Sequence, residues 1–424
     1  MAKLYVFGIG GTGSRTLRAL SMLLASGVEC KFETVVPVII DPDASAADMT
    51  RTVDALTRYM EVRKSLDFNS ANENKFFKTE ICPIQDMTSF KLALENTENV
   101  TFRDFMKTNQ MNDASRAFIN MLFSQANLDS DMVVGFKGNP NIGSVVLNQF
   151  STSEAYKAFS NAFDEGDRVF IISSIFGGTG ASGFPLLLKT LRNDKTSQHW
   201  AYIQKAKVGA VTVLPYFSVE QDDDSGVDSS TFYSKTKSAL AYYDRNISGN
   251  GSVDALYYIG DNKPASYKNH DGGTEQKNDA HMVELYAALS ILKFAATPDS
   301  ELGGRTLTYE YGIDTKDEDI KQVISQWKAI IGECAGVTRS YLAMAVPTLG
   351  PNGELLLCYD ELNAFGYIYE NRLGCLDKLK DLIAQRIGKE VQIEVQKTEL
   401  GQKASDTVPD LRELINMDIV EENF

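Results

Sequence analysis

The chain of 424 residues is poor in the residues that build metal centres and catalytic triads. It contains three histidines and five cysteines, and no two cysteines form a CxxC pair. Widely separated cysteines in odd number are typical neither of a disulfide framework nor of a zinc site. So few histidines leave little material for His-based metal or triad chemistry. We interpret the cysteines as buried thiols and expect no metal site built from side chains.

Long apolar runs are also missing. No stretch approaches the ~18 apolar residues needed to span a bilayer. The opening sequence MAKLYVFGIGG enters strand-like sequence directly, without the pattern of a secretory signal peptide. We therefore expect a cytoplasmic protein with no transmembrane segment.

Basic residues are outnumbered, and the formal net charge is -15. Such a chain repels polyanions, which argues against nonspecific binding to nucleic acid or to an anionic membrane surface. A small phosphorylated ligand is still possible. Backbone N–H groups and helix N-termini can hold phosphates, and neither contributes to the formal charge.

Apolar, β-branched runs alternate with amphipathic stretches along most of the chain. The strand-like runs cover residues 3–9, 34–41, 131–136, 168–176, 207–217 and 255–261, and the helix-like stretches cover 13–27, 143–163, 229–246 and 278–296. Strands that are apolar throughout, separated by helices, are typical of a parallel sheet covered on both faces. The sequence predicts an α/β fold with a doubly wound, mostly parallel sheet of the nucleotide-binding type.

The domain organisation follows from changes in composition. We expect a nucleotide-binding domain over residues 1–297 with a helical elaboration at 46–129, a smaller α+β domain at 298–400 joined through a long central helix, and an acidic tail at 401–424. In the smaller domain, residues 350–360 have the pattern of a hairpin and residues 362–388 that of one long helix.

A first glycine loop follows the first strand. Gly8, Gly10 and Gly13 match the GxGxxG pattern between a strand and a helix, where glycine lets the backbone approach a phosphate. After the next strand, Asp41 and Asp43 supply the acidic residues that such a site uses to contact a ribose. A glycine turn required only for packing is the alternative.

Further glycine-rich turns follow later strands. GGTGASG, residues 177–183, stands between an apolar run and a helix, with Thr179 as a side-chain donor for a phosphate oxygen. GNPNIG, residues 138–143, forms another strand-end turn, which is otherwise explained as a simple turn. Loops at the carboxyl ends of separated parallel strands converge at a switch point, so these loops together predict one triphosphate site. Neither glycine loop has the GK[ST] ending of a Walker A loop.

The order GIGGTGS, DPDA, GNPNIG and FGGTGASGFP resembles the loop order of the tubulin and FtsZ superfamily over roughly residues 1 to 300. The resemblance implies a protein that binds GTP or GDP, with Mg²⁺ bound through the phosphates. It implies nucleotide contacts at Gly10, Gly11, Thr12, Gly13, Ser14, Asp41, Asp43, Gly138, Asn139, Gly177, Gly178, Thr179, Gly180 and Ala181.

Other assignments rest on the resemblance alone. It implies a ribose contact at Glu220 and base contacts at Asn262, Asn278 and Asp279. An Asn amide or a carboxylate pairs with the donor edge of guanine. In the resembled family an acidic loop of the next subunit orients the attacking water, so the resemblance implies head-to-tail self-association. Asp299 and Glu301 are the acidic residues nearest to the expected place of that loop.

Departures from the family pattern leave other functions open, among them Thr274 and Glu275 at the place of the aromatic residue that stacks on guanine in the family. Ser14 and Arg15 replace the asparagine that follows the first loop in FtsZ, and the acidic NxDxxD motif is not reproduced. One alternative is a Rossmann-type enzyme that binds ATP or NAD and resembles the ThiF/E1 family. The other is a tubulin-like scaffold that does not hydrolyse nucleotide.

Overall fold

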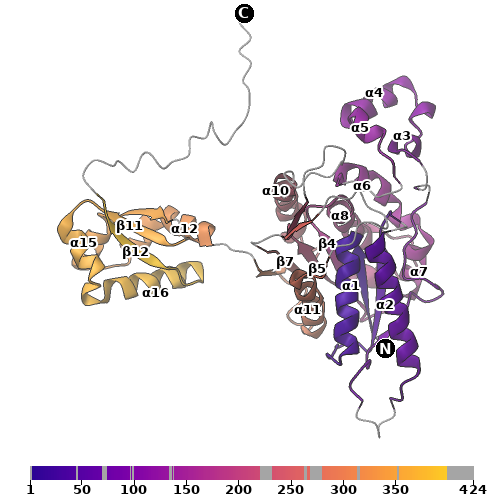
Figure 1. Cartoon of the computed structure of the whole chain (residues 1–424), viewed down its shortest axis with the longest axis horizontal. Helices are drawn as coiled ribbons and strands as arrows, with labels where there is room; N and C mark the ends of the chain where they lie inside the picture. The colour runs from indigo at the N-terminus through magenta and orange to yellow at the C-terminus, as the bar shows by residue number, and fades with distance from the viewer. Residues whose placement is uncertain are drawn as a thin grey trace, which may run out of the picture. The chain divides into compact units, whose positions relative to one another are not determined.

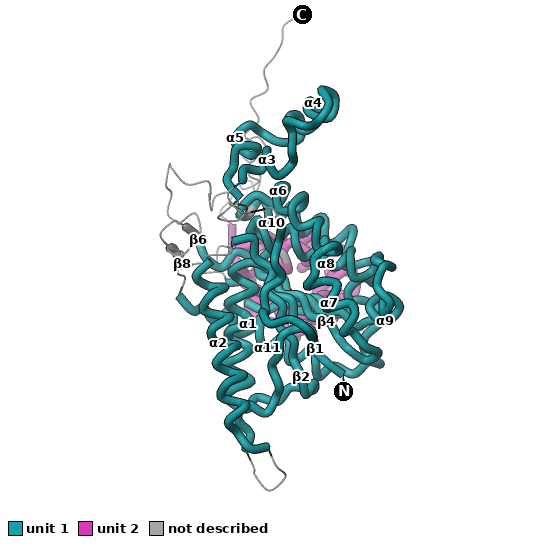
Figure 2. Tube along the Cα trace, turned by 90° about the vertical axis from the view of Figure 1, so that its right-hand side faces the viewer, with its two compact units in different colours: residues 1–313 teal, residues 314–424 magenta. Residues whose placement is uncertain are grey.

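The computed structural model describes residues 2–43, 46–68, 74–95, 97, 100–132, 136, 138–219, 232–261, 265–267, 279–312, 316–350 and 353–398. The chain divides into two compact units, residues 1–313 and 314–424, which Figure 2 colours separately. Each unit has its own cluster of buried apolar side chains. In the part of the chain that is described, none of the helices has the length and apolar character needed to cross a membrane.

The first unit is built on a seven-stranded sheet with the order β3-β2-β1-β4-β5-β7-β9, and all its neighbouring strands are parallel. The strands are β1 (Lys3–Ile9), β2 (Thr34–Ile40), β3 (Glu80–Ile81), β4 (Arg168–Ser174), β5 (Lys207–Val213), β7 (Ala255–Ile259) and β9 (Leu307–Tyr311). The central strands are buried along nearly their whole length. This confirms the predicted α/β fold with a parallel, doubly wound sheet.

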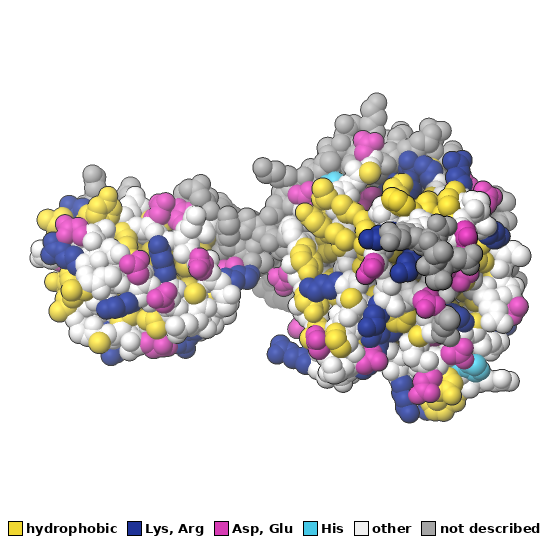
Figure 3. Space-filling model, turned by 90° about the horizontal axis from the view of Figure 1, so that it is seen from below, with side chains coloured by type: hydrophobic (Ala, Val, Ile, Leu, Met, Phe, Trp, Pro, Cys, Tyr) yellow, Lys and Arg dark blue, Asp and Glu magenta, His cyan; other side chains and the backbone are white. Residues whose placement is uncertain are grey.

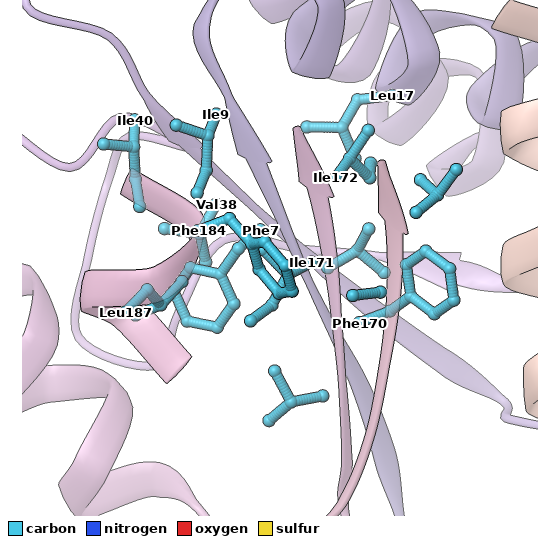
Figure 4. Close-up of a cluster of buried hydrophobic side chains, with 14 of the residues drawn as sticks. Phe7, Ile9, Leu17, Val38, Ile40, Phe170, Ile171, Ile172, Phe184 and Leu187 are labelled. Carbon is cyan, nitrogen blue, oxygen red and sulfur yellow. The ribbon is translucent and has the colours of Figure 1, made fainter. Parts of the chain in front are cut away.

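Helices cover both faces of this sheet (Figures 1 and 2). One face carries α1 (Gly10–Ala25), α2 (Ala47–Lys64) and α11 (Met282–Ala296), and the other carries α6 (Pro140–Val146), η2 (Leu147–Thr152), α7 (Glu154–Ala162), α8 (Gly178–Asn193) and α10 (Phe232–Tyr243). Figure 4 shows Phe184 and Leu187 of α8 gathered with the strand side chains Phe7 and Ile9. Alternate strand residues point to opposite faces, so each strand supplies both layers of the core.

The first helix packs unusually close to the first strand. A Cβ atom built on Gly13 would lie 2.4 Å from the carbonyl carbon of Gly8, and one built on Gly8 would lie 2.6 Å from Leu17 Cδ1. No side chain fits at these two contacts. This close approach sets the position of the N-terminus of α1 over the carboxyl end of β1.

Several shorter elements complete the first unit. They are α3 (Phe102–Phe105), η1 (Thr108–Gln110), α4 (Asp113–Leu122), α5 (Gln125–Leu128), β6 (Phe217–Val219), α9 (Trp200–Lys205), η4 (Asp244–Ser248) and β8 (Ala265–Tyr267), which pairs with β6. In Figure 1, α3, α4 and α5 stand apart from the two helical layers.

Ser153 divides the helix expected over residues 143–163, because its hydroxyl caps the N-terminus of α7 by accepting from the N–H of Tyr156. Part of the strand expected at 131–136 lies outside the described residues.

The second unit is a small α+β fold with the strand order β10-β11-β12. Its elements are α12 (Lys316–Ser325), α13 (Trp327–Gly332), α14 (Gly336–Leu342), β10 (Val346–Leu349), β11 (Leu355–Tyr359), α15 (Leu362–Tyr369), η6 (Arg372–Gly374), α16 (Cys375–Ile387) and β12 (Ile393–Lys397). β10 and β11 form an antiparallel hairpin, of which the predicted range 350–360 contains the turn and β11 but not β10. The prediction of a single helix over residues 362–388 is wrong. Asn371 and Leu373 have φ values of 48° and 58°, and residues in this left-handed conformation end a helix.

Charged side chains of both signs are interspersed on the face shown in Figure 3. On that face the excess of acidic residues is therefore not gathered into a single patch. A mixed surface of this kind favours solubility without a strong one-sided field.

We expect the two neighbouring glycines of the first loop to respond differently to alanine. Gly13→Ala forces a Cβ into the backbone of Gly8 and should lower the free energy of unfolding by about 3 kcal/mol. Gly11→Ala is the matched control, because its Cβ would meet nothing closer than 3.5 Å, and it should change stability by less than about 1 kcal/mol. Urea denaturation followed by circular dichroism measures both, and equal effects would contradict the packing role of Gly13.

Candidate nucleotide site

The two glycine loops flank the point where the strand order reverses. From β1 the chain builds outward through β2 and β3 on one side, and it then crosses to β4 on the other side of β1. The first loop leaves β1 and opens α1 at Gly10, while the second leaves β4 and opens α8 at Gly178. A crevice at the carboxyl ends of strands, at such a switch point, is where open α/β sheets bind ligands.

The loops lie in contact with each other. Gly10 has a φ of +71°, and a Cβ atom built on it would lie 3.5 Å from Thr179 Cβ. A Cβ atom on Gly178 would lie 2.9 Å from the backbone nitrogen of Asn139, which places the turn before α6 against the second loop. Segments more than 160 residues apart in the sequence therefore meet at one place.

Both long helices begin at this crevice, and both begin without a side-chain cap. No side-chain hydrogen bond caps α1 at Ile9 or α8 at Gly177. The first N–H groups of a helix have no intrahelical partner, and the helix dipole adds a partial positive charge. Two such N-termini side by side are suited to an anion.

The glycines of the loops divide into two kinds. Gly8, Gly13 and Gly180 allow close packing, since a Cβ on Gly180 would lie 2.6 Å from the carbonyl oxygen of Ser174. Gly10 and Gly11 meet no atom closer than 3.5 Å, which leaves room beside the first turn of α1. Some glycines of the two loops are therefore required for close packing, whereas Gly10 and Gly11 are not.

Several predicted contact residues already have structural roles. Ser14 is fully buried, its hydroxyl has no hydrogen-bond partner among the described residues, and its carbonyl accepts from Thr52. Asn139 caps α6 by accepting from Asn141 N–H, and its amide donates to Asn127. Ala181 lines a cavity on the far side of α8.

The acidic loop after β2 lies next to the first glycine loop, because β1 and β2 are neighbours. Asp41 accepts a hydrogen bond from the backbone N–H of Asp43 at 3.1 Å. Burial raises the pKa of Asp41 to about 7, and the nearby carboxylates of Asp43 and Asp48 add to the rise, whereas the hydrogen bond from the Asp43 N–H and the charge of Lys91 lower it. Asp41 is thus the group in this loop whose charge changes near neutral pH.

A buried ionic cluster lies directly beneath the first turn of α1. The Arg15 guanidinium donates to Glu284 of α11 and to Asp48 of α2, each at 2.6 Å, and also to the hydroxyl of Tyr216. Arg15 is 3% exposed, and Glu284 and Asp48 are each 4% exposed. Burial alone would lower the pKa of Arg15, but Tyr216, Asp48 and Glu284 together raise it, so the guanidinium stays charged.

The Arg15 cluster is the feature that sequence reasoning missed. Arg15 departs from the FtsZ pattern at this position, but nothing in the sequence indicates its partners. A local signal for Glu284 does exist. His281 and Glu284 form a capping box at the start of α11, with the usual three-residue spacing but with His in the place of Ser or Thr.

The remaining predicted residues do not meet at the crevice within the described structure. Glu220, Asn262 and Asn278 lie outside the described residues, and Asp279 is exposed just before α11. Asp299 forms an ion pair at 2.7 Å with Arg168, the first residue of β4, and Glu301 is exposed nearby. They therefore lie at the amino end of β4, whereas the second glycine loop follows its carboxyl end. No group of three or more His, Cys, Asp or Glu residues suited to a metal ion occurs among the described residues.

Because the pKa of Asp41 is about 7 in the folded chain and its ordinary value is 3.8, ionising Asp41 is harder in the folded state than in the unfolded state. Its contribution to stability is therefore lost as the pH rises between about 4 and 7. Asp41→Asn keeps an acceptor for the Asp43 N–H but cannot ionise. We expect the difference between the urea midpoint of the variant and that of the parent chain to increase from about pH 5 to about pH 8. A difference that is the same at all pH values would contradict the raised pKa.

No protein-family model and no curated protein matches the chain. Among solved structures it is similar to CetZ2 from Haloferax volcanii, described as a GTPgS-bound protofilament, with 11% identity, a TM-score of 0.34, and coverage of 94% of this chain and 89% of that one. It is similar to the GDP-bound monomer of CetZ1 from Haloferax volcanii, with 11% identity, a TM-score of 0.34, and coverage of 94% and 90%. A helical model of the TubZ-Bt two-stranded filament matches with 10% identity, a TM-score of 0.29, and coverage of 95% and 82%. Each of these three alignments covers most of this chain and most of the other chain, at 10 to 11% identity.

Proposed function

We propose that the chain binds a guanine nucleotide, GTP or GDP, in the crevice between the two glycine loops, with Mg²⁺ bound through the phosphates. The single observation that supports this most directly is the contact of two uncapped helix N-termini at the switch point of a parallel sheet. The phosphates would face Gly10 to Gly13 and Gly177 to Thr179, with Gly138 and Asn139 at one side.

Backbone groups supply the attraction for phosphate in this proposal. Arg15 lies nearest to the first loop, but its charge is matched by Asp48 and Glu284. Asp48 also pairs with Arg51 at 2.6 Å. A cluster of two cations and two carboxylates adds no net charge, so the N–H groups of the helix termini and the bound Mg²⁺ would balance the triphosphate.

We propose that any hydrolysis requires a second copy of the chain. Asp299 and Glu301 lie beyond the amino end of β4, and a strand of seven residues separates that end from the second glycine loop. Seven residues of strand span roughly 20 Å, so a carboxylate there cannot reach a phosphate at the loop of its own subunit. A head-to-tail neighbour would bring the two ends together, which is how the proposal accounts for self-association.

A Rossmann-type enzyme that binds ATP or NAD remains the second candidate. Asp41 supports it, because an acidic residue directly after β2, beside the glycine loop of β1, is the position that contacts a ribose in that fold. A tubulin-like scaffold without hydrolysis is the third. Calorimetric titration of the purified chain with GTP, GDP, ATP and NAD in the presence of Mg²⁺ distinguishes a guanine-nucleotide site from an ATP or NAD site, and an assay of phosphate release identifies the scaffold.

Thr179→Val tests the proposed phosphate contact. The side chain keeps its shape and loses its hydroxyl, so the affinity for GTP should fall roughly tenfold, as expected for one hydrogen bond to a charged group. Thr190→Val on the same helix is the matched control, because its hydroxyl donates to Leu186 within α8, and it should leave the affinity unchanged. Equal affinities for the two variants would count against a site at the second loop.

Glu301→Gln tests the proposed catalytic role of the acidic residues near the amino end of β4. Glu301 is exposed, so the variant should fold and bind GTP like the parent chain. If the carboxylate acts on a neighbouring subunit, phosphate release should fall about a hundredfold while GTP-dependent sedimentation persists. Unchanged phosphate release would exclude Glu301 from the reaction.

A further inference from the structure

A cavity of about 610 Å³ lies on the face of α8 that points away from α1. Its walls are α8, α10 and the start of α6, and Ile175, Phe176 and Gly177 close one end. Cavities of roughly 300–1,000 Å³ are the usual size for small-molecule sites. This one is distinct from the crevice between the glycine loops, because Thr179 faces Gly10 whereas Ala181 faces the cavity.

Small side chains on the facing helices create the space. Ala181, Pro185 and Lys189 of α8 follow one another at intervals of four residues and line the same face, which Gly177 continues just before the helix begins. The facing stripe on α10 consists of Ser234, Lys235, Ser238, Ala239, Tyr242 and Tyr243. The glycine, the alanines and the serines among them are too short to fill the gap between two packed helices, and Tyr242 and Pro185 supply apolar surface in the hollow that is left.

The described lining of the cavity is cationic, although the chain as a whole is strongly acidic. Among the described residues that line it there are two lysines and no carboxylate, while the net charge of the chain is -15. The Lys235 ammonium donates to the carbonyl of Gly138 at 3.0 Å, beside the glycine loop. Lys189 is exposed about three helical turns further along α8. Of the two lysines, Lys189 is thus the one whose side chain is exposed for an anionic ligand.

The serines of the lining leave acceptors for a ligand. Ser144, Ser182 and Ser238 donate their hydroxyl protons to carbonyls four residues earlier in their own helices. Their oxygens keep lone pairs that can accept from a hydroxyl or an N–H of a bound molecule. The walls thus combine apolar surface, acceptors and cations, which matches an anionic amphipathic molecule.

We propose that this cavity is a binding site for a small anionic molecule with an aromatic or aliphatic body. Its body would lie against Pro185 and Tyr242, and its anionic group would lie near the exposed Lys189, because the Lys235 ammonium already donates to the carbonyl of Gly138. The site goes beyond the proposed nucleotide function and does not depend on it. Gly177 belongs to both the cavity wall and the second glycine loop, so a molecule bound in the cavity would contact the residue at which α8 begins.

Anilinonaphthalene sulfonate is a suitable probe, because it carries one anionic group on an aromatic body and fluoresces when it leaves water. Phenylnaphthylamine has the same rings without the sulfonate. Fluorescence titration of the full chain should give one saturable site for the sulfonate, at least tenfold tighter than for the neutral probe. Neutral and anionic probes binding equally well would overturn the proposal.

Substitutions on α8 and α10 test whether the sulfonate probe binds in this cavity. Lys189→Glu should weaken sulfonate binding roughly tenfold or more. Lys237→Glu makes the same charge change on α10 at an exposed residue that does not line the cavity, and it should have less than a twofold effect. Ser238→Trp fills the groove from an exposed helix position and should abolish the site with an unchanged circular dichroism spectrum. Equal effects of the two lysine variants, or full binding to Ser238→Trp, would place the probe elsewhere and exclude this cavity.

Discussion

A single buried guanidinium joins the three helices that cover one face of the sheet. Arg15 lies in the first turns of α1, and its two carboxylate partners come from α2 and from the start of α11. A buried charge is tolerated only when it is paired and hydrogen-bonded, so these three helices can pack on one face of the sheet only in the arrangement that keeps the pairs together. Together with the Gly8–Gly13 contact, the cluster determines where the N-terminus of α1 points.

That arrangement has a consequence for ligand chemistry. Because Arg15 is fully engaged, its charge stabilises the protein and is not available to attract a phosphate. The attraction available at the crevice comes from backbone N–H groups of α1 and α8, whose directions are set by the strands that precede them. Asp41, whose pKa is raised to about 7 by burial, makes the acidic side of the crevice sensitive to pH.

Helix α8 has two different faces along its first turns. Thr179 faces Gly10 and the first glycine loop, Gly183 packs against Ile9 of β1, and Ala181 and Pro185 face the cavity beside α10. A helix places successive residues about 100° apart, so a segment as short as GGTGASG contributes to both sites. The same glycine-rich composition that permits close packing on one side leaves open space on the other.

The sequence by itself determined the layered α/β fold and the position of the glycine loops, because apolar strand runs and glycine turns are local patterns. It also placed Asp41 and Asp43 at the end of a strand, and the turn and second strand of the hairpin in the second unit. The local sequence pattern gave a wrong helix where the backbone conformation of a few residues ends it. Asn371 and Leu373 have left-handed φ values, which divide a run of residues with helical periodicity into two helices. Tertiary structure alone paired Arg15 with Glu284, which are 269 residues apart, and brought α8 and α10 together around the cavity. Such contacts depend on which strands become neighbours in the sheet, and the order of motifs along a chain does not contain that information.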